Sequence, residues 1–230
     1  MEHPFTWYSM LPFAEKIPVH VFHACLAFII LILVGWRIRR SLSQSKDPLI
    51  PEPRFSVRNI FEIVVQAILG QLHAIIGHGG EKYLPLIGGL FIFIFFCNIL
   101  GVIPGFVPAT DNINTNVAMS LMVFLVYNYL GFKEHGIKYL KQFAGPVLWL
   151  APLMFVIELL SHVFRPMSLS IRLFGNMFGD HMVLSIFSGL VPLVVPIIFM
   201  ILGIVVSLIQ AFVFSVLSAV YIALAVSHEH

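Results

Sequence analysis

Six polar residues recur at helical spacing inside an otherwise apolar C-terminal third of this 230-residue sequence. They are Glu158, Ser161, Arg165, Ser168, Arg172 and Asn176. On an α-helix with about 100° per residue, all of them lie within about 40° of Arg172, in one polar stripe roughly 27 Å long. That length is close to the hydrocarbon thickness of a bilayer, about 30 Å. Because a charge near the bilayer centre costs about 2.5–3.5 kcal/mol on insertion scales, the three charges of this stripe require a function or a partner.

The simplest structural explanation pairs two of these charges. Glu158 and Arg165 are seven residues apart and can neutralise each other inside a helical bundle. Arg172 has no comparable acidic partner within its own helix. We therefore expect its partner on another helix or on another subunit.

The elements that position this stripe must be membrane helices. The sequence is 59% hydrophobic and only 10% charged, whereas soluble domains carry about 25% charged residues. We therefore predict an all-α integral membrane protein. Its formal net charge of +2 is too small to suggest a nucleic-acid partner. Cys25 and Cys97 lie in apolar stretches without CxxC spacing, so we expect neither a disulfide nor a metal site.

Apolar segments predict five membrane-crossing helices and one interfacial helix in a single membrane domain, residues 1–230. The first span and a Pro-punctuated linker lie within 1–58, and a pair of helices occupies 83–132. Residues 146–227 hold two apolar stretches, each longer than the ~20 residues that a perpendicular span needs, which favours a long tilted hairpin. Within 59–80, polar residues recur every three or four positions, so we expect an amphipathic helix lying in the interface.

The distribution of lysine and arginine predicts the orientation of these spans. Three arginines within 37–40 follow the first span, and three lysines lie within 133–145. By the positive-inside rule these segments face the cytoplasm, which places the N-terminus outside and the C-terminus in the cytoplasm. The loop 104–116 contains no lysine or arginine, which fits the external side.

Two motifs at the C-terminal end resemble a known family. RPMSLSIRLFGNMFGDH (165–181) and SLIQAFVFSVLSAVYIALA (207–225) are similar in order and spacing to subunit a of bacterial F-type ATP synthases, and weaker similarity extends back to about Phe91. The resemblance implies a multi-pass stator subunit of the plasma membrane that conducts an ion, most simply the proton. Its implied partners are a ring of c subunits, the peripheral-stalk b subunits and the lipid bilayer. It also implies no catalysis and no cofactor in this chain, which has no P-loop.

The resemblance also assigns roles to the polar stripe. Arg172 would face the c-ring and separate two ion half-paths, because arginine keeps its proton even when poorly solvated. Glu158, Ser161 and His162 would line the inner half-path, although His162 fits a structural role equally well. Arg165 is expected to reach the lipid phosphates, as long basic side chains near helix ends do.

The outer half-path is where this sequence departs from the family. Family members often carry an acid or a histidine seven residues before the glutamine that corresponds to Gln210, and here that position is Gly203. We therefore expect Asp180 and His181 to carry the outer half-path jointly, with water in the space left by Gly203. Alternatively, Asp180 caps backbone and His181 bonds a neighbouring helix.

Two further residues, Asn176 and Asn98, are candidates for the ion path. Asn176, on the first arm of the hairpin, is expected to continue the path outward from Arg172. Asn98 could extend the path towards solvent, although asparagines near loops are often turn formers. The rival function from another class is a stand-alone secondary transporter that binds an anionic substrate at Arg172.

Overall fold

The computed structural model describes residues 7–10, 17–44, 56–77, 79–103, 105–137, 139, 151–190 and 194–226. Its regular elements in these residues are all helical, which confirms the predicted class. The long helices are α1 (Val19–Gln44), α2 (Val57–Ile76), α3 (Leu84–Leu100), α4 (Ile113–His135), α6 (Ala151–Leu190) and α7 (Val194–Val226). Short 3-10 turns are η1 (Trp7–Met10), η2 (Gly80–Tyr83) and η3 (Ala109–Asp111). All six long helices are apolar and long enough to cross a membrane.

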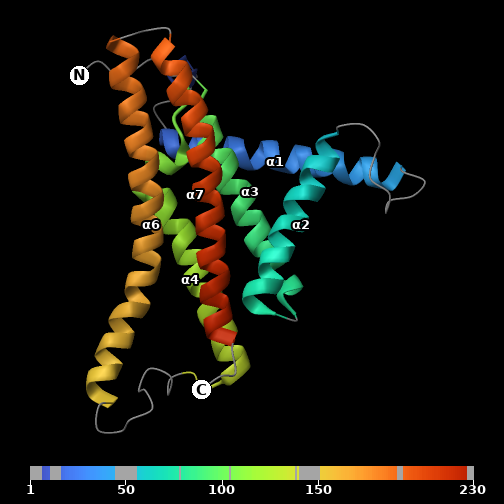
Figure 1. Ribbon diagram of the computed structural model, residues 1–230, viewed down its shortest axis with the longest axis vertical. Helices are drawn as coiled ribbons and strands as arrows, with labels where there is room; N and C mark the ends of the chain where they lie inside the picture. Colours follow the sequence, from blue (N-terminus) through green and yellow to red (C-terminus); the bar gives the residue numbers. More distant parts are fainter. Residues whose placement is uncertain are drawn as a thin grey trace.

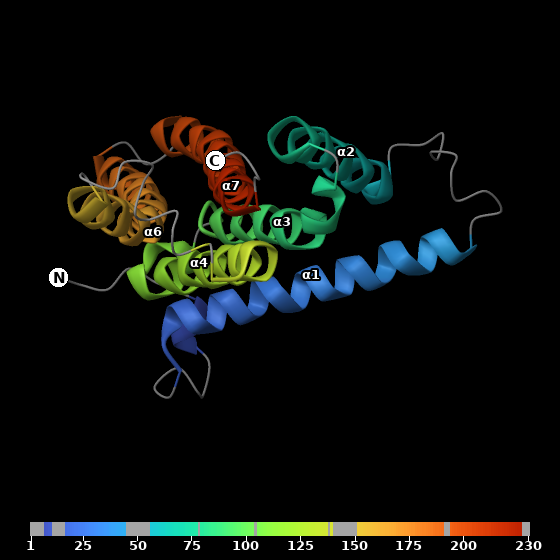
Figure 2. The same ribbon diagram turned by 90° about the horizontal axis from the view of Figure 1, so that it is seen from below.

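The last two helices form the long hairpin, in which α6 has 40 residues and α7 has 33. At about 1.5 Å per residue, α6 is roughly 60 Å long, twice the hydrocarbon thickness. α6 and α7 run beside each other, whereas α1 runs across their direction (Figures 1 and 2). If α1 crosses the bilayer directly, the hairpin must therefore be strongly tilted, by roughly 60° from the normal to fit its length.

Two predicted boundaries differ from those observed. α1 continues through the arginine cluster to Gln44, so the linker begins later than expected. α2 ends at Ile76 instead of near residue 80, because Gly77 adopts a φ of 80° in the left-handed region that favours glycine. The start of the hairpin at 146–150, most of the linker, the lysines at 138 and 141 and the last four residues lie outside the described residues.

The placement of α2 in the interface stays a prediction. Its N-terminus is capped by Ser56, whose side chain accepts a hydrogen bond from the Arg58 backbone N–H. Arg58 then pairs with Glu62 at 2.7 Å on the next turn. α2 also has the length and composition of a membrane span, so the argument for the interface remains its polar stripe.

The core of the molecule lies where α3, α4, α6 and α7 meet. Ile94, Tyr127, Leu173, Phe214 and Ile222 are almost completely buried there. Because lipid is as apolar as these side chains, packing and interhelical hydrogen bonds hold membrane helices together. One such contact joins α4 to α6 through the hydroxyls of Ser120 and Ser170, 2.5 Å apart.

Candidate functional site

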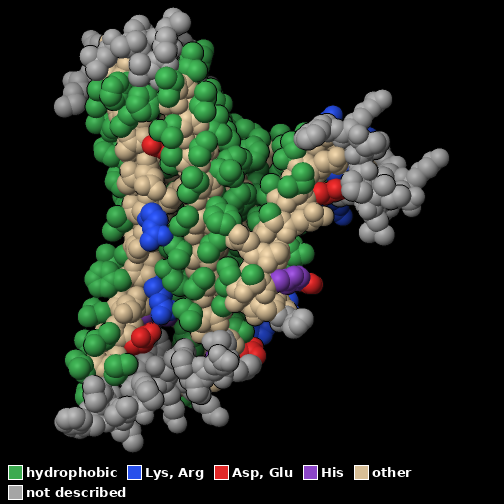
Figure 3. All heavy atoms as spheres, viewed as in Figure 1, with side chains coloured by type: hydrophobic (Ala, Val, Ile, Leu, Met, Phe, Trp, Pro, Cys, Tyr) green, Lys and Arg blue, Asp and Glu red, His purple; other side chains and the backbone are tan. Residues whose placement is uncertain are grey.

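Arg172 lies near the middle of α6, and its side chain is exposed on the surface of the protein. The residue is exposed, as are Ser168, Gly175 and Asn176 on the same face. Its guanidinium makes no hydrogen bond or ion pair with any described residue. Figure 3 shows Lys and Arg side chains at two places along α6, whose only such residues are Arg165 and Arg172. If α6 is centred on the bilayer, the charge of Arg172 lies near the midplane whatever the tilt of the helix.

Beside Arg172, a hydrogen bond joins the two arms of the hairpin. Asn176 Nδ2 donates to Gln210 Oε1 at 2.6 Å, and Gln210 is only 3% exposed. The sequence placed both residues on the ion path, and the structure brings them together one turn beyond Arg172. They therefore fix the separation of α6 and α7 at the level of the arginine.

The N-terminal end of the stripe contains an ion pair. Arg165 Nη2 lies 3.4 Å from Glu158 Oε1, and the Arg165 guanidinium lies 5.6 Å from the centre of the Tyr221 ring on α7. The expectation that Arg165 reaches the lipid phosphates is therefore wrong, because its charge is held by an acid and an aromatic face within the chain. Glu158 and Arg165 remain partly exposed, and Ser161 is exposed on the same side of α6.

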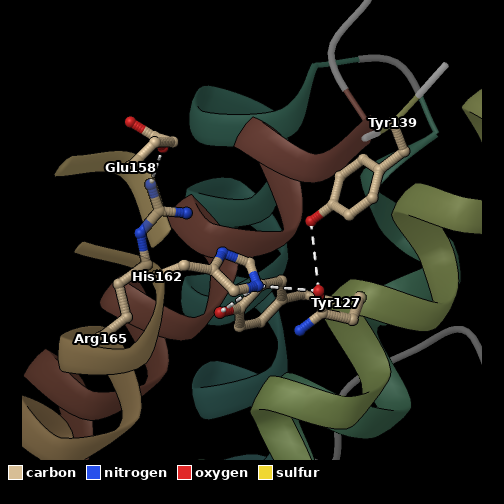
Figure 4. Close-up of polar contacts among 6 residues, drawn as sticks. Tyr127, Tyr139, Glu158, His162 and Arg165 are labelled. Carbon is tan, nitrogen blue, oxygen red and sulfur yellow. Dashed lines mark hydrogen bonds and ion pairs between the residues drawn. The ribbon is translucent and has the colours of Figure 1, made fainter. Parts of the chain in front are cut away.

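His162 faces a different direction from the stripe. It is 7% exposed and packs against α4, where its Nε2 donates to Asn128 Oδ1 at 2.8 Å and its ring stands edge-on to Tyr127. The Tyr139 hydroxyl donates to the same Asn128 oxygen at 3.4 Å (Figure 4). These contacts favour the structural role for His162, which fastens α6 to α4 and to Tyr139.

The C-terminal half of α6 carries a second group of titratable residues. His181 Nδ1 lies 3.1 Å from Oδ2 of Asp111, which ends the η3 turn between α3 and α4. The other carboxylate oxygen of Asp111 is buried and makes no hydrogen bond within the described structure. Sequence reasoning missed Asp111 as a site residue. The signal was present, because Asp111 is the only acidic residue in the loop 104–116.

A small cavity of about 30 Å³ lies next to this pair. Its lining includes Asn98, Asp180, His181, Gly203 and Ser207, so the structure joins the residues that the sequence assigned to the outer path. Asp180 Oδ2 and Asn98 Nδ2 are buried and lack hydrogen-bond partners among the described residues. A cavity needs roughly 10–15 Å³ for each water, so this one has room for about two.

The Glu158–Arg165 pair and the group around His181 lie on opposite sides of Arg172 along α6. They do not meet along the face of α6 that packs against the rest of the protein. Glu158 is 14 residues before Arg172 and His181 is nine after it, about 21 and 14 Å along the helix. Between them, Leu169 and Leu173 are 2% and 0% exposed. The arrangement can hold ions or protons at two separate places beside one fixed positive charge.

Comparison with known proteins agrees with this geometry. Residues 11–223 match the family model described as ATP synthase A chain. A protein of Bdellovibrio bacteriovorus named ATP synthase subunit a is 44% identical over 227 residues, covering 98% of this chain and 99% of the relative. The subunit a of Geobacter sulfurreducens is 40% identical and both chains are covered completely, and the subunit a 1 of Syntrophotalea carbinolica is 45% identical over 92% of this chain and 87% of its own. The chain is thus a multi-pass bacterial membrane protein, and it belongs to the ATP synthase A chain family.

Proposed function

We propose that the chain conducts protons through two offset half-paths at its contact with a ring of c subunits, with Arg172 separating the paths. The observation that carries this proposal is the charge of Arg172, exposed at the middle of α6 without a partner among the described residues. A deprotonated carboxylate presented by a rotor subunit would neutralise that charge. The guanidinium stays protonated, so it also repels cations that would pass directly between the half-paths.

The inner half-path consists of Glu158 and Ser161 beside the paired Arg165. Glu158 is the proton-exchanging group, since its carboxylate is partly exposed at the end of the polar stripe. His162 holds α6 in its position against α4 and does not exchange protons. Arg165 keeps Glu158 oriented, and its stacking on Tyr221 limits its own movement.

The outer half-path consists of Asp180, His181 and Asn98, around the cavity next to Gly203. Histidine exchanges protons near neutral pH, which suits it to this position. Asn176 and Gln210 lead from this cavity towards Arg172, and their hydrogen bond keeps the hairpin arms in place. Water bound by Asp180 and Asn98 supplies the exchange that a second-arm acid or histidine would otherwise supply.

The chain acts within a larger assembly and carries out no ATP chemistry itself. The relatives are named as subunits of an ATP synthase. We propose the c-ring as the partner of the exposed face of α6 and the peripheral-stalk b subunits as further partners. The comparisons do not support a stand-alone transporter for an anionic substrate.

Purification of the chain from its membrane in mild detergent tests this proposal. We expect a c-ring and peripheral-stalk subunits to co-purify with it, and the isolated chain to bind no small anion saturably. A chain that purifies alone and binds an anion at Arg172 with saturation would contradict the proposed function. Arg172→Ala should abolish that binding if the transporter function were correct.

A further inference from the structure

We propose that Asp111, from the loop between α3 and α4, carries protons between external water and His181. This inference rests on the proposed function and adds to it a residue from outside the hairpin. The Asp111 side chain is 16% exposed and that of His181 30%, so the pair lies at a boundary between solvent and interior. The Oδ2–Nδ1 distance of 3.1 Å is within hydrogen-bond reach, as proton exchange requires.

The fold holds Asp111 in this position through buried polar groups. Thr110 and Asn116 are 0% exposed, and Asn98 is 2% exposed. Asn116 Nδ2 donates to the Thr110 carbonyl at 2.7 Å, and Thr110 Oγ1 donates to Asn98 Oδ1 at 2.6 Å. Buried amides and hydroxyls of this kind fix a loop, because breaking them leaves polar atoms unpaired. The turn that ends in Asp111 is therefore anchored to α3 and α4.

A continuous sequence of exchange sites follows from Asp111 inward. The Asp111 side chain is 16% exposed, so its carboxylate can exchange a proton with water. His181 is the next group, and it lines the cavity that also holds Asp180 and the unpaired amide of Asn98. The path from the external loop to the hairpin thus has titratable groups at Asp111, His181 and Asp180, joined by water in the cavity.

In one transfer cycle, a single proton passes from external water to Asp180. The Asp111 carboxylate takes a proton from external water, and the carboxyl group passes a proton to Nδ1 of neutral His181. The imidazolium ring then rotates so that Nδ1–H faces the cavity, and it releases that proton to water there, which passes it to Asp180. Asp111 is left as a carboxylate, and neutral His181, still protonated at Nε2, rotates back to its starting position.

The competing explanation is that the pair only fastens the loop to α6. Asp111→Asn separates the two explanations. The amide has the same shape as the carboxylate and keeps a hydrogen bond to Nδ1 in either tautomer, because its Nδ2–H donates to a bare Nδ1 and its Oδ1 accepts from Nδ1–H, but it cannot carry a proton. A fastening role therefore predicts a nearly normal Asp111→Asn variant, whereas a relay role predicts a slow one.

The experiment uses the complete ATP synthase in proteoliposomes, with ATP synthesis driven by an imposed proton gradient. We expect Asp111→Asn to lower the rate about 100-fold or more, since about 100-fold is the lower end of what a positioned proton-transfer group contributes. Asp111→Glu, or formate supplied on the side of the outer path, should restore at least half of the wild-type rate, because both supply a proton carrier.

The relay is overturned if Asp111→Asn keeps more than half of the wild-type rate, or if its slowed rate is restored by neither change. Asn114→Asp, which alters an exposed residue three positions away, serves as the control and should behave as wild type. Arg172→Ala is measured alongside. If Arg172→Ala is inactive while Asp111→Asn is normal, only the relay fails, and if Arg172→Ala is active, the proposed function itself fails.

Discussion

Gly203 offers a way to test whether water in the small cavity carries protons. A methyl group added at Gly203 would meet Val102 Cγ2 at 3.5 Å, an ordinary contact, so Gly203→Ala should fold normally. The methyl would nevertheless take the space of about one of the two waters that 30 Å³ can hold. Gly203→Ser fills nearly the same space but adds a hydroxyl that can bond Asp180.

The expected magnitude follows from the buried Asp180 oxygen. Leaving a buried polar atom without a partner costs about 1–3 kcal/mol, which slows a step that depends on it roughly 5- to 150-fold. Gly203→Ala should therefore slow proton-driven ATP synthesis by that factor, and Gly203→Ser should stay close to wild type. Gly89→Ala is the matched control, because that helical glycine also has open space around it.

The assay is ATP synthesis by reconstituted synthase at a fixed imposed proton gradient, normalised to the amount of assembled complex. A Gly203→Ala variant as fast as wild type would refute the proposed role of cavity water. Equal slowing of the alanine and serine variants would refute the hydrogen-bond argument, since it would leave crowding as the cause.

The remaining predictions concern the outer path, the topology and the inner end. Asp180→Asn and His181→Ala should each slow proton-driven synthesis, and the double variant should nearly stop it; normal pumping by the double variant would place outer access elsewhere. With Cys25 and Cys97 replaced, cysteines at Asn114 and Lys133 should react with an impermeant thiol reagent from opposite sides of the membrane, and labelling of both from one side would contradict the orientation. His162→Ala should weaken the complex against heat or detergent by an amount typical of an interhelical hydrogen bond, about 0.6–1.7 kcal/mol, while the rate per assembled complex stays the same; an unchanged stability with a lost rate would restore His162 to the ion path.

Periodicity and composition predicted the helical elements well, because each membrane span must be apolar over a fixed length. They also predicted which face of α6 is polar, since the angle between residues follows from the helix alone. Boundaries were less well predicted: α2 ends at Gly77 because of a backbone conformation that residue spacing does not show.

Contacts between distant segments could not be predicted in the same way. Asp111 and His181 are 70 residues apart, and nothing local to either residue indicates that the loop between α3 and α4 folds back onto α6. Similarly, the pairing of His162 with Asn128 depends on how α4 packs against α6. Arg165 was misassigned for the same reason, because its contact with Tyr221 comes from the second arm of the hairpin.

The most direct test of the account is proton-driven ATP synthesis by a fully assembled Arg172→Ala complex. We predict no synthesis, because the variant lacks the exposed charge proposed to meet the rotor carboxylate and to separate the half-paths. Assembly should be intact, because Arg172 contacts no described charged group. Arg172→Lys should also fail, since lysine can lose its proton in this environment. Substantial synthesis by the assembled Arg172→Ala complex would contradict the account.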